Sequence, residues 1–439
     1  MSESSGSVSR RQFARTLAQA GALAAAPMIV PSSVLGQRAG AVPPSDRIVF
    51  GGIGIGNRGM SSVACILSYR DARMVAVADV RNERRELIKS TVDKRYQNND
   101  CKMYSSHEEL LDRDDIDGVL IATGDRWHTP MSILAAKAGK HIYCEKPCSM
   151  TIQESQALAE AVRRYGIVYQ AGCQRRNGKN FVFAMEMARG GKLGKLQTLH
   201  CNAGTGTQWP PITSHDWLPA EPEPAKEVVD WDRWLGPCPW RPYNPLYVQG
   251  RWRGYFDFHG GGILEWGSHT ADLCQYVNDA DNTQPVEYEP QGGNTTPYFI
   301  YCRYANGVKL VHRDSGWLGL GTCSVRFEGD NGWVETGDSG KIEVSENLKS
   351  ELPPPEQGNA FNLTLHYHWR DFVECIKTRS QARSHATAAA NTHIGCHAAY
   401  IAYLLGRKLT WDPAKQEFVN DAEANRMRSR EMRPPWRLV

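Results

Sequence analysis

From residue 47 onward, short apolar runs of strand length alternate with amphipathic stretches of helix length. The apolar runs are rich in β-branched residues, and they occupy 47–54, 74–80, 118–123, 141–145 and 167–172. The clearest helix is 151–166, in which Thr151 and Glu154 form a capping box and Gly166 ends the helix. Strict alternation of this kind predicts an α/β fold with a doubly wound parallel sheet that helices cover on both faces.

The second half of the chain has hairpins in place of this alternation. Two apolar stretches, 297–313 and 323–337, are each interrupted by an Asn-Gly pair, at Asn306 and at Asn331. Asn-Gly between apolar runs is a strong short-range signal for a β-hairpin, whose strands pair antiparallel. Helical patterns follow near 363–378 and 386–405.

Length and composition indicate two globular domains. With 439 residues, 41% of them hydrophobic and 23% charged, the chain has enough apolar material for two cores, and global disorder is excluded. We place a first domain at 42–172 and a second at 173–439, after an N-terminal segment at 1–41. The net charge of +3 is modest and gives no sign of a nucleic-acid-binding surface.

The segment 1–41 has the features of a twin-arginine export signal. Arg10 and Arg11 are paired, Phe13 follows, and the Ala/Gly/Leu run after it is too short and too weakly apolar to span a bilayer. Ala-Gly-Ala at 39–41 is a candidate cleavage site, and 24–27 offers a competitor. This interpretation predicts export by the twin-arginine machinery to the periplasm or cell envelope; a basic tail without a targeting role is the alternative.

The twelve cysteines are scattered, with neither a CxxC pair nor a Cys/His cluster at zinc spacing. We therefore expect most of them to be buried as small hydrophobic residues, and we expect no metal site built on them.

A glycine-rich turn directly follows the first predicted strand. Gly54, Gly56 and Gly59 form GxGxxG at the start of a helix, where glycine permits a close approach of the backbone to a pyrophosphate. Asp79 ends the second strand 20 residues after Gly59, where its carboxylate can accept hydrogen bonds from ribose hydroxyls. This combination favours NAD(H). Arg81 can instead pair with a 2′-phosphate, so NADP(H) stays open, as does an α/β domain that binds no nucleotide.

Two polar segments stand at the carboxyl ends of later strands, where open α/β sheets bind ligands. They are ATGDRWHTP at 122–130 and CEKPCSM at 144–150. In the second, a lysine at 146 beside a nicotinamide ring can donate to a carbinol oxygen and stabilise its alkoxide as hydride leaves. The alternative for Lys146 is a surface lysine in a salt bridge.

A third polar segment is HGGGILEWGSHTADL at 259–273. Its three acid and base side chains, Glu265, His269 and Asp272, are spaced so that a continuous helix would present them on about one face. That spacing suits metal ligands, an acid/base pair or an ordinary helix start, and the segment alone does not decide among them.

Taken together, these motifs resemble the Gfo/Idh/MocA oxidoreductases. The family pattern has GxGxxG, a strand-end Asp, a D-x-x-H segment, a Glu-Lys-Pro turn and a downstream GGG-x-x-acid-x-x-x-His-x-x-Asp, in this order. The resemblance covers nearly the whole chain after 41. The segments 231–245 and 406–436 look like the exported subgroup of the family.

The resemblance implies a Rossmann domain followed by an α/β domain with an open, largely antiparallel sheet that binds substrate and often forms oligomer contacts. It assigns catalysis to Lys146 and His269, and substrate binding to Asp272. Glu265 departs from the aspartate that is usual there and brings one more methylene. We expect His269 to take the hydroxyl proton, Glu265 or Asp272 to orient the imidazole, and Lys146 to stabilise the oxyanion.

The candidate cofactor residues are those of the glycine turn, the strand ends and the Glu-Lys-Pro turn: Gly54, Gly56, Asn57, Arg58, Gly59, Asp79, Arg81, Thr123, Asp125, His128, Glu145, Lys146 and Gln174. The candidate substrate contacts, besides Asp272, are Arg176, Trp252, Tyr255 and Phe256, for which core packing and a surface arginine are the alternative.

The resemblance implies hydride transfer to or from a secondary hydroxyl of a sugar, cyclitol or glycoside, with tightly bound NAD in a homo-oligomer. One alternative is a glycoside hydrolase or lyase that oxidises the sugar transiently. A second is a binding protein without turnover, and a third is a metal site at Glu265 and His269.

Overall fold

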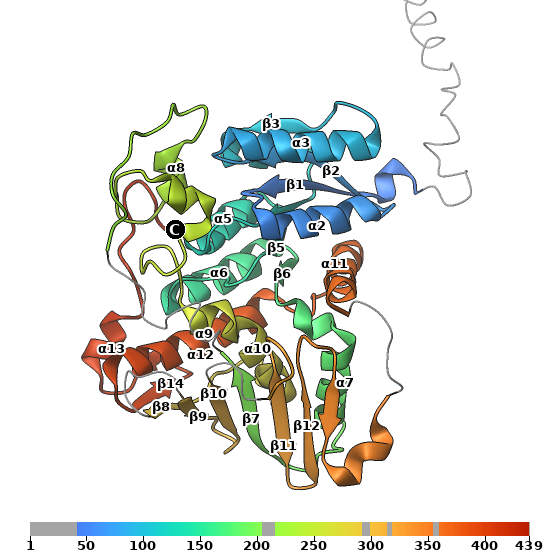
Figure 1. Ribbon diagram of the computed structural model, residues 1–439, viewed down its shortest axis with the longest axis vertical. Coiled ribbons are helices and arrows are strands. Elements are labelled where there is room, and N and C mark those ends of the chain that lie inside the picture. The colour runs from blue at the N-terminus through green and yellow to red at the C-terminus, as the bar shows by residue number, and fades with distance from the viewer. Residues whose placement is uncertain (1–41, 204–215, 292–298, 314–317, 354–359, 439) are drawn as a thin grey trace, which may run out of the picture. The chain divides into compact units, whose positions relative to one another are not determined.

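The computed structural model describes residues 42–203, 216–291, 299–313, 318–353 and 360–438. The predicted export signal at 1–41 lies outside the described residues. In the unit that ends at Arg47, the described part holds one 3-10 turn, η1 (Pro44–Asp46). Residues 48–439 form the second compact unit, and it contains two sheets (Figure 1).

The first sheet has six strands, all parallel, in the order β3-β2-β1-β4-β5-β6. Its strands are β1 (Ile48–Ile53), β2 (Ala72–Ala78), β3 (Lys102–Tyr104), β4 (Gly118–Ile121), β5 (His141–Cys144) and β6 (Tyr169–Ala171). The order reverses direction beside β1, which creates the crevice where doubly wound sheets bind dinucleotides. The predicted parallel sheet is confirmed. The short strand β3 was not expected from the sequence.

Helices cover both faces of this sheet, as predicted. One face packs against α2 (Asn57–Ser68) and α3 (Asn82–Tyr96), and the other against α4 (His107–Leu111), α5 (Asp125–Lys137) and α6 (Ile152–Tyr165). The predicted N-cap of α6 is confirmed, because Thr151 accepts the N–H of Glu154, and Gly166 ends the helix in the left-handed conformation. The return bond of the capping box is shifted by one residue, since the Glu154 carboxylate accepts the N–H of Met150. A helix from far along the chain, α11 (Ala360–Thr378), joins the α2 face.

The second sheet has nine strands in the order β13-β12-β11-β7-β10-β9-β8-β14-β15, and only the pair β7–β10 is parallel. Its strands are β7 (Leu196–Asn202), β8 (Glu287–Gln291), β9 (Phe299–Arg303), β10 (Lys309–Arg313), β11 (Val325–Gly329), β12 (Gly332–Thr336), β13 (Ile342–Val344), β14 (Leu409–Asp412) and β15 (Glu417–Phe418). Both Asn-Gly pairs lie between antiparallel neighbours, so the two predicted hairpins are confirmed.

Three helices pack on one face of the nine-stranded sheet and form the largest apolar cluster: α7 (Lys179–Arg189), α10 (Gly267–Val277) and α12 (Ala386–Leu405). The helix α12 also reaches the first sheet, because Ala386 and Ala389 belong to the apolar cluster of α5 and α6. The short elements are η2 (Gln174–Asn177), α9 (Gly262–Glu265), η5 (Glu346–Glu351) and α13 (Ala422–Arg426).

Residues 216–258, which we call the connecting segment, lead from β7 back to the first sheet. The segment holds α8 (Trp231–Leu235) and a π-helical turn, η4 (Tyr247–Arg251), and it has an aromatic cluster of its own around Trp231, Tyr247 and Phe258. A β-bridge between Arg81 and Val229 fastens it to the end of β2.

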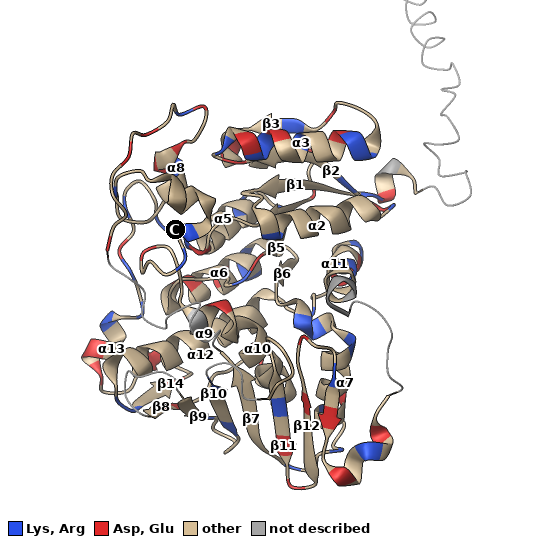
Figure 2. Ribbon diagram, viewed as in Figure 1, with Lys and Arg blue, Asp and Glu red and all other residues tan. Residues whose placement is uncertain are grey.

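The cysteines are all free and eleven of the twelve are buried, which confirms their expected packing role. Charged residues of both signs alternate along α3, whereas β1 carries none (Figure 2). Among the described residues, no helix has both the length and the apolar character that crossing a membrane requires.

Candidate active site

The glycine turn after β1 leaves room for a ligand at the start of α2. Gly54 has a φ of +65°, and a Cβ there would lie 2.2 Å from Cγ2 of Thr123, so any larger residue would collide. Gly56 caps α2 without a side-chain hydrogen bond, which leaves the first N–H groups of the helix available. Backbone donors at a helix N-terminus favour an anionic group such as a pyrophosphate.

Asp79 follows β2 at the far side of the same cleft. Its carboxylate is 8% exposed and accepts the backbone N–H of Arg81 at 2.9 Å. Burial raises the pKa of this carboxyl, and the neighbouring arginines oppose the shift. Arg84 donates from Nε to the carbonyl of Ile55, inside the glycine turn, at 3.0 Å. The cleft thus offers an acceptor for ribose hydroxyls and a guanidinium beside the pyrophosphate turn.

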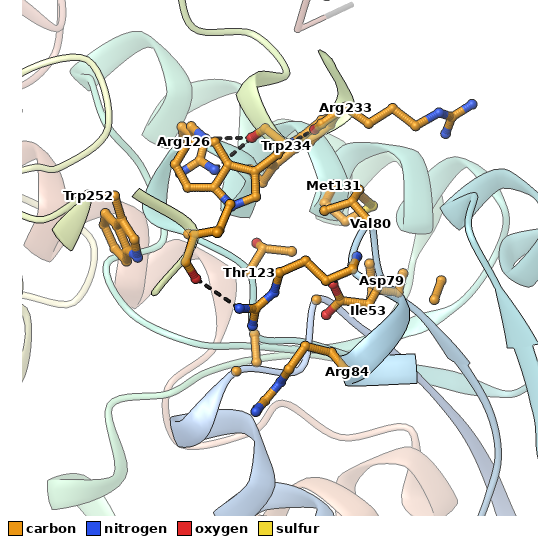
Figure 3. A pocket seen from close by; sticks show the side chains of 18 of the residues that line it. Ile53, Asp79, Val80, Arg84, Thr123, Arg126, Met131, Arg233, Trp234 and Trp252 are labelled. Atoms are coloured by element: carbon orange, nitrogen blue, oxygen red, sulfur yellow. Dashed lines mark hydrogen bonds between the residues drawn. The ribbon is translucent and has the colours of Figure 1, made fainter. Parts of the chain in front are cut away.

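The connecting segment forms the opposite wall of this cleft (Figure 3). Arg126, at the start of α5, donates from Nε and Nη2 to the carbonyl of Trp234, at 3.0 and 2.6 Å, and its guanidinium lies 3.7 Å from the centre of the Trp234 ring. Arg81 donates to the carbonyl of Val248 at 2.8 Å. The cavity between the two walls has a volume of about 290 Å³.

The residues present fit a dinucleotide: an open helix N-terminus, a glycine cradle that a Cβ would fill, and a strand-end carboxylate. The predicted cofactor residues that line the cavity are Gly54, Gly56, Asn57, Arg58, Asp79, Arg81 and Thr123. Those that do not line it are Gly59, Asp125, His128, Glu145, Lys146 and Gln174. Gly59 packs against Ala122 instead, where a Cβ would meet the alanine methyl at 2.9 Å.

Two of the residues outside the cavity lining connect the glycine turn to the sheet edge. Glu145 accepts from Nε of Arg58 at 3.1 Å. Gln174, with its amide oxygen toward the guanidinium groups, accepts from Arg58 at 3.1 Å and from Arg175 at 2.9 Å. Both side chains are buried, and both extend the polar network around Arg58 toward η2.

The turn that carries Lys146 is fixed by both domains. His128 donates from Nδ1 to the carbonyl of Pro147 at 2.6 Å. His393 of α12 accepts the backbone N–H of Cys148 at 3.0 Å. Because both anchors are buried, the lysine side chain starts from a rigid backbone. His128 therefore holds the turn through Pro147 and does not line the cavity.

Lys146 extends to the second domain and contacts one residue twice. Its Nζ lies 2.9 Å from Oε1 of Glu265 and donates to the backbone carbonyl of the same residue, also at 2.9 Å. The two side chains are 12% and 10% exposed. Burial alone would raise the pKa of Glu265, but Lys146 and His259 hold the pKa well below its ordinary value. The pair is therefore an ammonium and a carboxylate.

Glu265 and His269 do not share a helix. The helix α9 ends at Glu265 and α10 begins at Gly267, with Trp266 between them. The N–H of His269 bonds to the carbonyl of Trp266, whereas the carbonyl of Glu265, its partner in a continuous helix, accepts from Lys146. The expected common face is therefore broken, and the two side chains have different partners.

His269 pairs with an arginine that the sequence analysis did not single out. Nη1 of Arg175 donates to Nε2 of His269 at 2.8 Å. Asp338, in the turn after β12, accepts from Nε and Nη2 of Arg175 at 3.0 and 2.6 Å. Burial, Arg175 and Lys146 hold the pKa of His269 well below its ordinary value. The expected hydrogen bond from Glu265 or Asp272 to the imidazole is absent from this arrangement.

Arg176 and Asp272 are paired with each other in the interior. Arg176 donates to both carboxylate oxygens of Asp272, at 2.6 and 2.8 Å, and to Asp281, at 2.7 and 2.8 Å. Neither Arg176 nor Asp272 is more than 1% exposed. Their roles as substrate contacts stay predictions, and the structure gives each of them a structural partner.

The aromatic substrate candidates differ in position. Trp252 lines the cleft (Figure 3). Tyr255 packs edge-on against Tyr247 in the aromatic cluster of the connecting segment. Phe256 lies under the guanidinium of Arg430, 3.7 Å from it, and its carbonyl accepts from the same arginine. Only Trp252 among the three is placed on the cavity wall.

A set of three potential metal ligands lies beside Lys146. Asp125, His259 and Glu265 are buried, and their ligand atoms lie within 4.8 Å of one another. However, Nδ1 of His259 accepts the N–H groups of Gly254 and Gly261, at 3.4 and 3.2 Å, so the ring proton is on Nε2, the nitrogen that faces Glu265 at 3.5 Å. A protonated nitrogen and the adjacent ammonium do not fit a cation.

The residues of the candidate site that the sequence analysis did not predict are Arg126, Arg175, Trp234, His259 and Asp338. The sequence analysis singled out Arg176 alone, and nothing in CQRRN tells which of its two adjacent arginines is directed toward His269. His259 directly precedes the three glycines, which was the one available signal for it.

Comparison with known proteins agrees with this geometry. Residues 48–173 match the model described as "Oxidoreductase family, NAD-binding Rossmann fold", and residues 184–438 match its counterpart "Oxidoreductase family, C-terminal alpha/beta domain". The chain belongs to the Gfo/Idh/MocA oxidoreductase family. The first domain of this family member is thus an NAD-binding Rossmann domain.

The relatives include myo-inositol 2-dehydrogenase from Thermotoga maritima, 29% identical over 267 residues, which are 59% of this chain and 66% of the relative. Glycosyl hydrolase family 109 protein 1 from Shewanella sp. (strain ANA-3) is 31% identical over 178 residues, 38% of this chain and 36% of that protein. The chain therefore matches about two thirds of the first relative's length and about a third of the second's.

Among solved structures, the WlbA dehydrogenase from Bordetella pertussis, in complex with NADH and UDP-GlcNAcA, has a TM-score of 0.61 at 15% identity. The match covers 83% of this chain and 98% of that one. The likeness supports the two-domain fold described above.

Proposed function

We propose that this protein is an NAD-dependent oxidoreductase that transfers hydride to or from a secondary hydroxyl of a sugar or cyclitol. The observation that carries the proposal is the position of Lys146. It leaves the carboxyl end of β5, at the sheet edge that also holds the glycine turn, and its ammonium is held by a carboxylate of the second domain. Myo-inositol 2-dehydrogenase among the relatives supports a polyhydroxylated substrate.

Bound NAD would supply the hydride acceptor or donor. The cleft residues bind it: the start of α2 takes the pyrophosphate, and Asp79 takes the ribose hydroxyls. The Lys146 ammonium donates to the substrate oxygen and stabilises the negative charge that develops there. The hydroxyl proton has two candidate acceptors, the His269 imidazole expected from the sequence and the Lys146–Glu265 pair.

NAD is favoured over NADP by the two residues that face the adenosine end. The Asp79 carboxylate lines the cavity and would repel a 2′-phosphate. The Arg81 guanidinium, which was the residue that kept NADP open, is engaged by the carbonyl of Val248 and lies 3.3 Å from Glu83. A phosphate would have to compete with both partners.

A second candidate is redox-assisted cleavage of a glycoside. In that reaction the sugar is oxidised, the neighbouring glycosidic bond is eliminated and the sugar is reduced again, so that NAD is recycled. The match to a glycosyl hydrolase family 109 protein supports it, although the match covers only 36% of that protein. The same Lys146 and cofactor cleft would serve both reactions.

We further propose that the protein is exported by its twin-arginine segment with the nucleotide already bound. The connecting segment supports retention of the nucleotide, because it forms the second wall of the cleft and is fastened by Arg126 and Arg81. A retained cofactor would be recycled between two substrates. A homo-oligomer, which the resemblance implies, stays part of this proposal.

The test begins with the nucleotide. Protein purified without added cofactor is denatured, and the released small molecules are analysed by mass spectrometry; NAD(H) is expected. The intact protein is then offered cyclitols, aldoses and aryl glycosides, and hydride transfer is followed at ~340 nm, the NADH band of the cofactor. Ketone product without cleavage supports the first candidate, and cleavage without net NADH supports the second. If the protein releases no nucleotide and transfers no hydride with any of these compounds, both candidates are overturned.

A further inference from the structure

Three side chains, of which Arg175 and His269 are buried and Asp338 is partly buried, form a line that ends at the candidate active site. Asp338 accepts two hydrogen bonds from the guanidinium of Arg175, and the third nitrogen of that guanidinium donates to Nε2 of His269 at 2.8 Å. Arg175 is 4% exposed and His269 is 2% exposed. Thr322 also donates from Oγ1 to Asp338, at 2.6 Å. The line joins η2, α10 and the β12 turn.

This line determines where the imidazole carries its proton. A guanidinium has no acceptor, so Nε2 of His269 must be the accepting nitrogen and must be unprotonated. The neutral ring therefore has its proton on Nδ1. In the described part of the structure, Nδ1 is buried and has no hydrogen-bond partner. Buried polar groups nearly always have a partner, so an unpartnered N–H beside Lys146 indicates a place for an oxygen atom.

We propose that Arg175, held by Asp338, is a positioning residue that fixes His269 as a neutral hydrogen-bond donor, with Nδ1–H directed to the substrate oxygen. The inference rests on the proposed function and deepens it, because it assigns the imidazole a role other than proton acceptor. Acceptance of the hydroxyl proton at Nδ1 would require a proton on Nε2, which would then face the N–H of Arg175.

The charges around His269 agree with a ring that stays neutral. The titratable groups that act on it are Arg175 from η2, Lys146 from the turn after β5, Arg58 from α2 and His368 from α11. All four disfavour a second proton, as does burial, and together they lower the pKa of His269 well below its ordinary value. An imidazolium intermediate would therefore form beside three permanent or near-permanent cations.

The acceptor of the hydroxyl proton is then the Lys146–Glu265 pair. During oxidation, Nζ of Lys146 first passes one of its protons to Oε1 of Glu265, 2.9 Å away, and the neutral amine then takes the hydroxyl proton as the O–H bond breaks. The C–H electron pair leaves as hydride to the nicotinamide. The substrate thus loses one proton and one hydride, Glu265 gains the proton, and His269 keeps its ring proton throughout.

The first test reads the tautomer without a substrate. Protein with ¹⁵N-labelled histidine rings is compared with the His269→Asn variant, and the signal that disappears belongs to His269. We expect Nδ1 protonated and Nε2 unprotonated from pH 8 to below about 6, the range in which an ordinary histidine titrates. A ring protonated on Nε2, or one that titrates near 6.5, would overturn the proposal whether or not any substrate is known.

The matched variant is the pair Arg175→Gln with Asp338→Asn, which removes one charge of each sign and retains polar side chains. We expect the pKa of His269 to rise toward its ordinary value of 6.5, so that the ring gains a second proton at mildly acidic pH. Arg175→Lys keeps the charge but not the planar guanidinium that bonds Asp338 and His269 at the same time. We therefore expect the pKa of His269 to stay low in this variant, and the ring to populate both neutral tautomers. Circular dichroism and the melting temperature establish that each variant is folded.

The second test uses two amides at position 269. Asparagine places its N–H near the position of Nδ1, whereas glutamine places it near Nε2. If His269 acts as a donor, His269→Asn retains at least about tenfold more hydride transfer than His269→Gln or His269→Ala, because one good hydrogen bond to the reacting oxygen is retained. Equal loss in all three variants, with NAD still bound and the fold intact, contradicts the donor role. Loss of bound NAD in the parent protein would instead contradict the proposed function.

Discussion

Nζ of Lys146 lies 2.9 Å from the carboxylate of Glu265 and 2.9 Å from the backbone carbonyl of the same residue. One ammonium group therefore neutralises the side chain of Glu265 and also takes the carbonyl that would continue the helix into His269. The contact joins the two domains, because Lys146 follows β5 and Glu265 ends α9. The same ammonium group thus contacts the Glu265 carboxylate and the backbone at the break between α9 and α10.

Replacement of this lysine tests its role directly. Lys146→Met keeps most of the side-chain volume but removes the charge, so we expect hydride transfer to fall by ~10²- to 10⁴-fold with NAD still bound. The measurement is single-turnover reduction of bound NAD by a substrate of the panel. Lys349→Met, at a site that is 60% exposed, is the matched control. Normal turnover in Lys146→Met would remove the lysine from the mechanism.

The glycine turn can be tested with two alanines. Gly54→Ala adds a Cβ 2.2 Å from Thr123, whereas Gly139→Ala meets nothing within 4 Å, although the glycines have similar φ values, +65° and +72°. Both variants should lose roughly 1–2 kcal/mol for the left-handed backbone. We expect Gly54→Ala to lose more stability and also its bound nucleotide. Thermal unfolding and nucleotide content measure the two effects, and equal behaviour of the variants would contradict the cradle.

The connecting segment should control how fast the nucleotide leaves. Arg126→Met removes the two hydrogen bonds to the carbonyl of Trp234, each charge-assisted and worth about 1.5–3 kcal/mol in the net. We expect nucleotide release to accelerate at least about tenfold. Arg163→Met, on the exposed side of α6, is the control. Release that is already fast in the parent protein would contradict cofactor retention.

The stability of the protein should fall between mildly acidic and neutral pH because of Glu154. This carboxyl caps α6 from a buried position, where burial raises its pKa from 4.5 to about 7. The folded state therefore holds the proton more tightly than the unfolded state, and the free energy of unfolding decreases as pH rises from about 4.5 to about 7. The decrease amounts to at most about 3 kcal/mol.

Glu154→Gln should remove this pH dependence, because an amide does not titrate in this range. The glutamine oxygen can still accept the N–H of Met150, so the hydrogen bond is kept. Urea unfolding at pH 5 and pH 8 measures it. Glu160→Gln, on the exposed side of the same helix, should leave the parent's pH profile unchanged. A parent protein whose stability does not fall over this range would show that the carboxyl is not retained in its protonated form.

A chelator should leave hydride transfer unchanged. Asp125, His259 and Glu265 are close enough for a metal, but the proton on Nε2 of His259 and the Lys146 ammonium occupy the place of a cation. Activity is compared after dialysis against EDTA and after addition of zinc or magnesium. Loss of activity on dialysis and its return with one metal would restore the metal interpretation.

Much of the fold could be predicted from the sequence because its signals are local. The apolar runs of the first sheet, the capping box at Thr151 and the two Asn-Gly hairpins all act within a few residues. The strand β3 has only three residues, too few for a period to be recognised. The connecting segment has no regular period, so its position against the cleft depends on contacts such as that of Arg126 with Trp234.

The candidate site was predicted less completely, for a physical reason. The spacing of Glu265, His269 and Asp272 predicts a common helix face only if the helix is continuous. At the interruption, the carbonyl of Glu265 bonds to Lys146, 119 residues away, and no local pattern contains this contact. The expected partner of His269 was Glu265 or Asp272, whereas the structure places Arg175 there. The adjacent arginines at 175 and 176 give the same local pattern whichever of them faces the imidazole.

Those two arginines leave neighbouring positions of η2 and bind α10 one turn apart, Arg175 at His269 and Arg176 at Asp272. The second pair therefore fixes the position of η2 against α10, and with it the position of Arg175 relative to His269. In an activity screen, substitutions at 176 or 272 would be read as catalytic defects. A library designed to change substrate preference should hold both positions constant and vary the cleft wall around Trp252 instead.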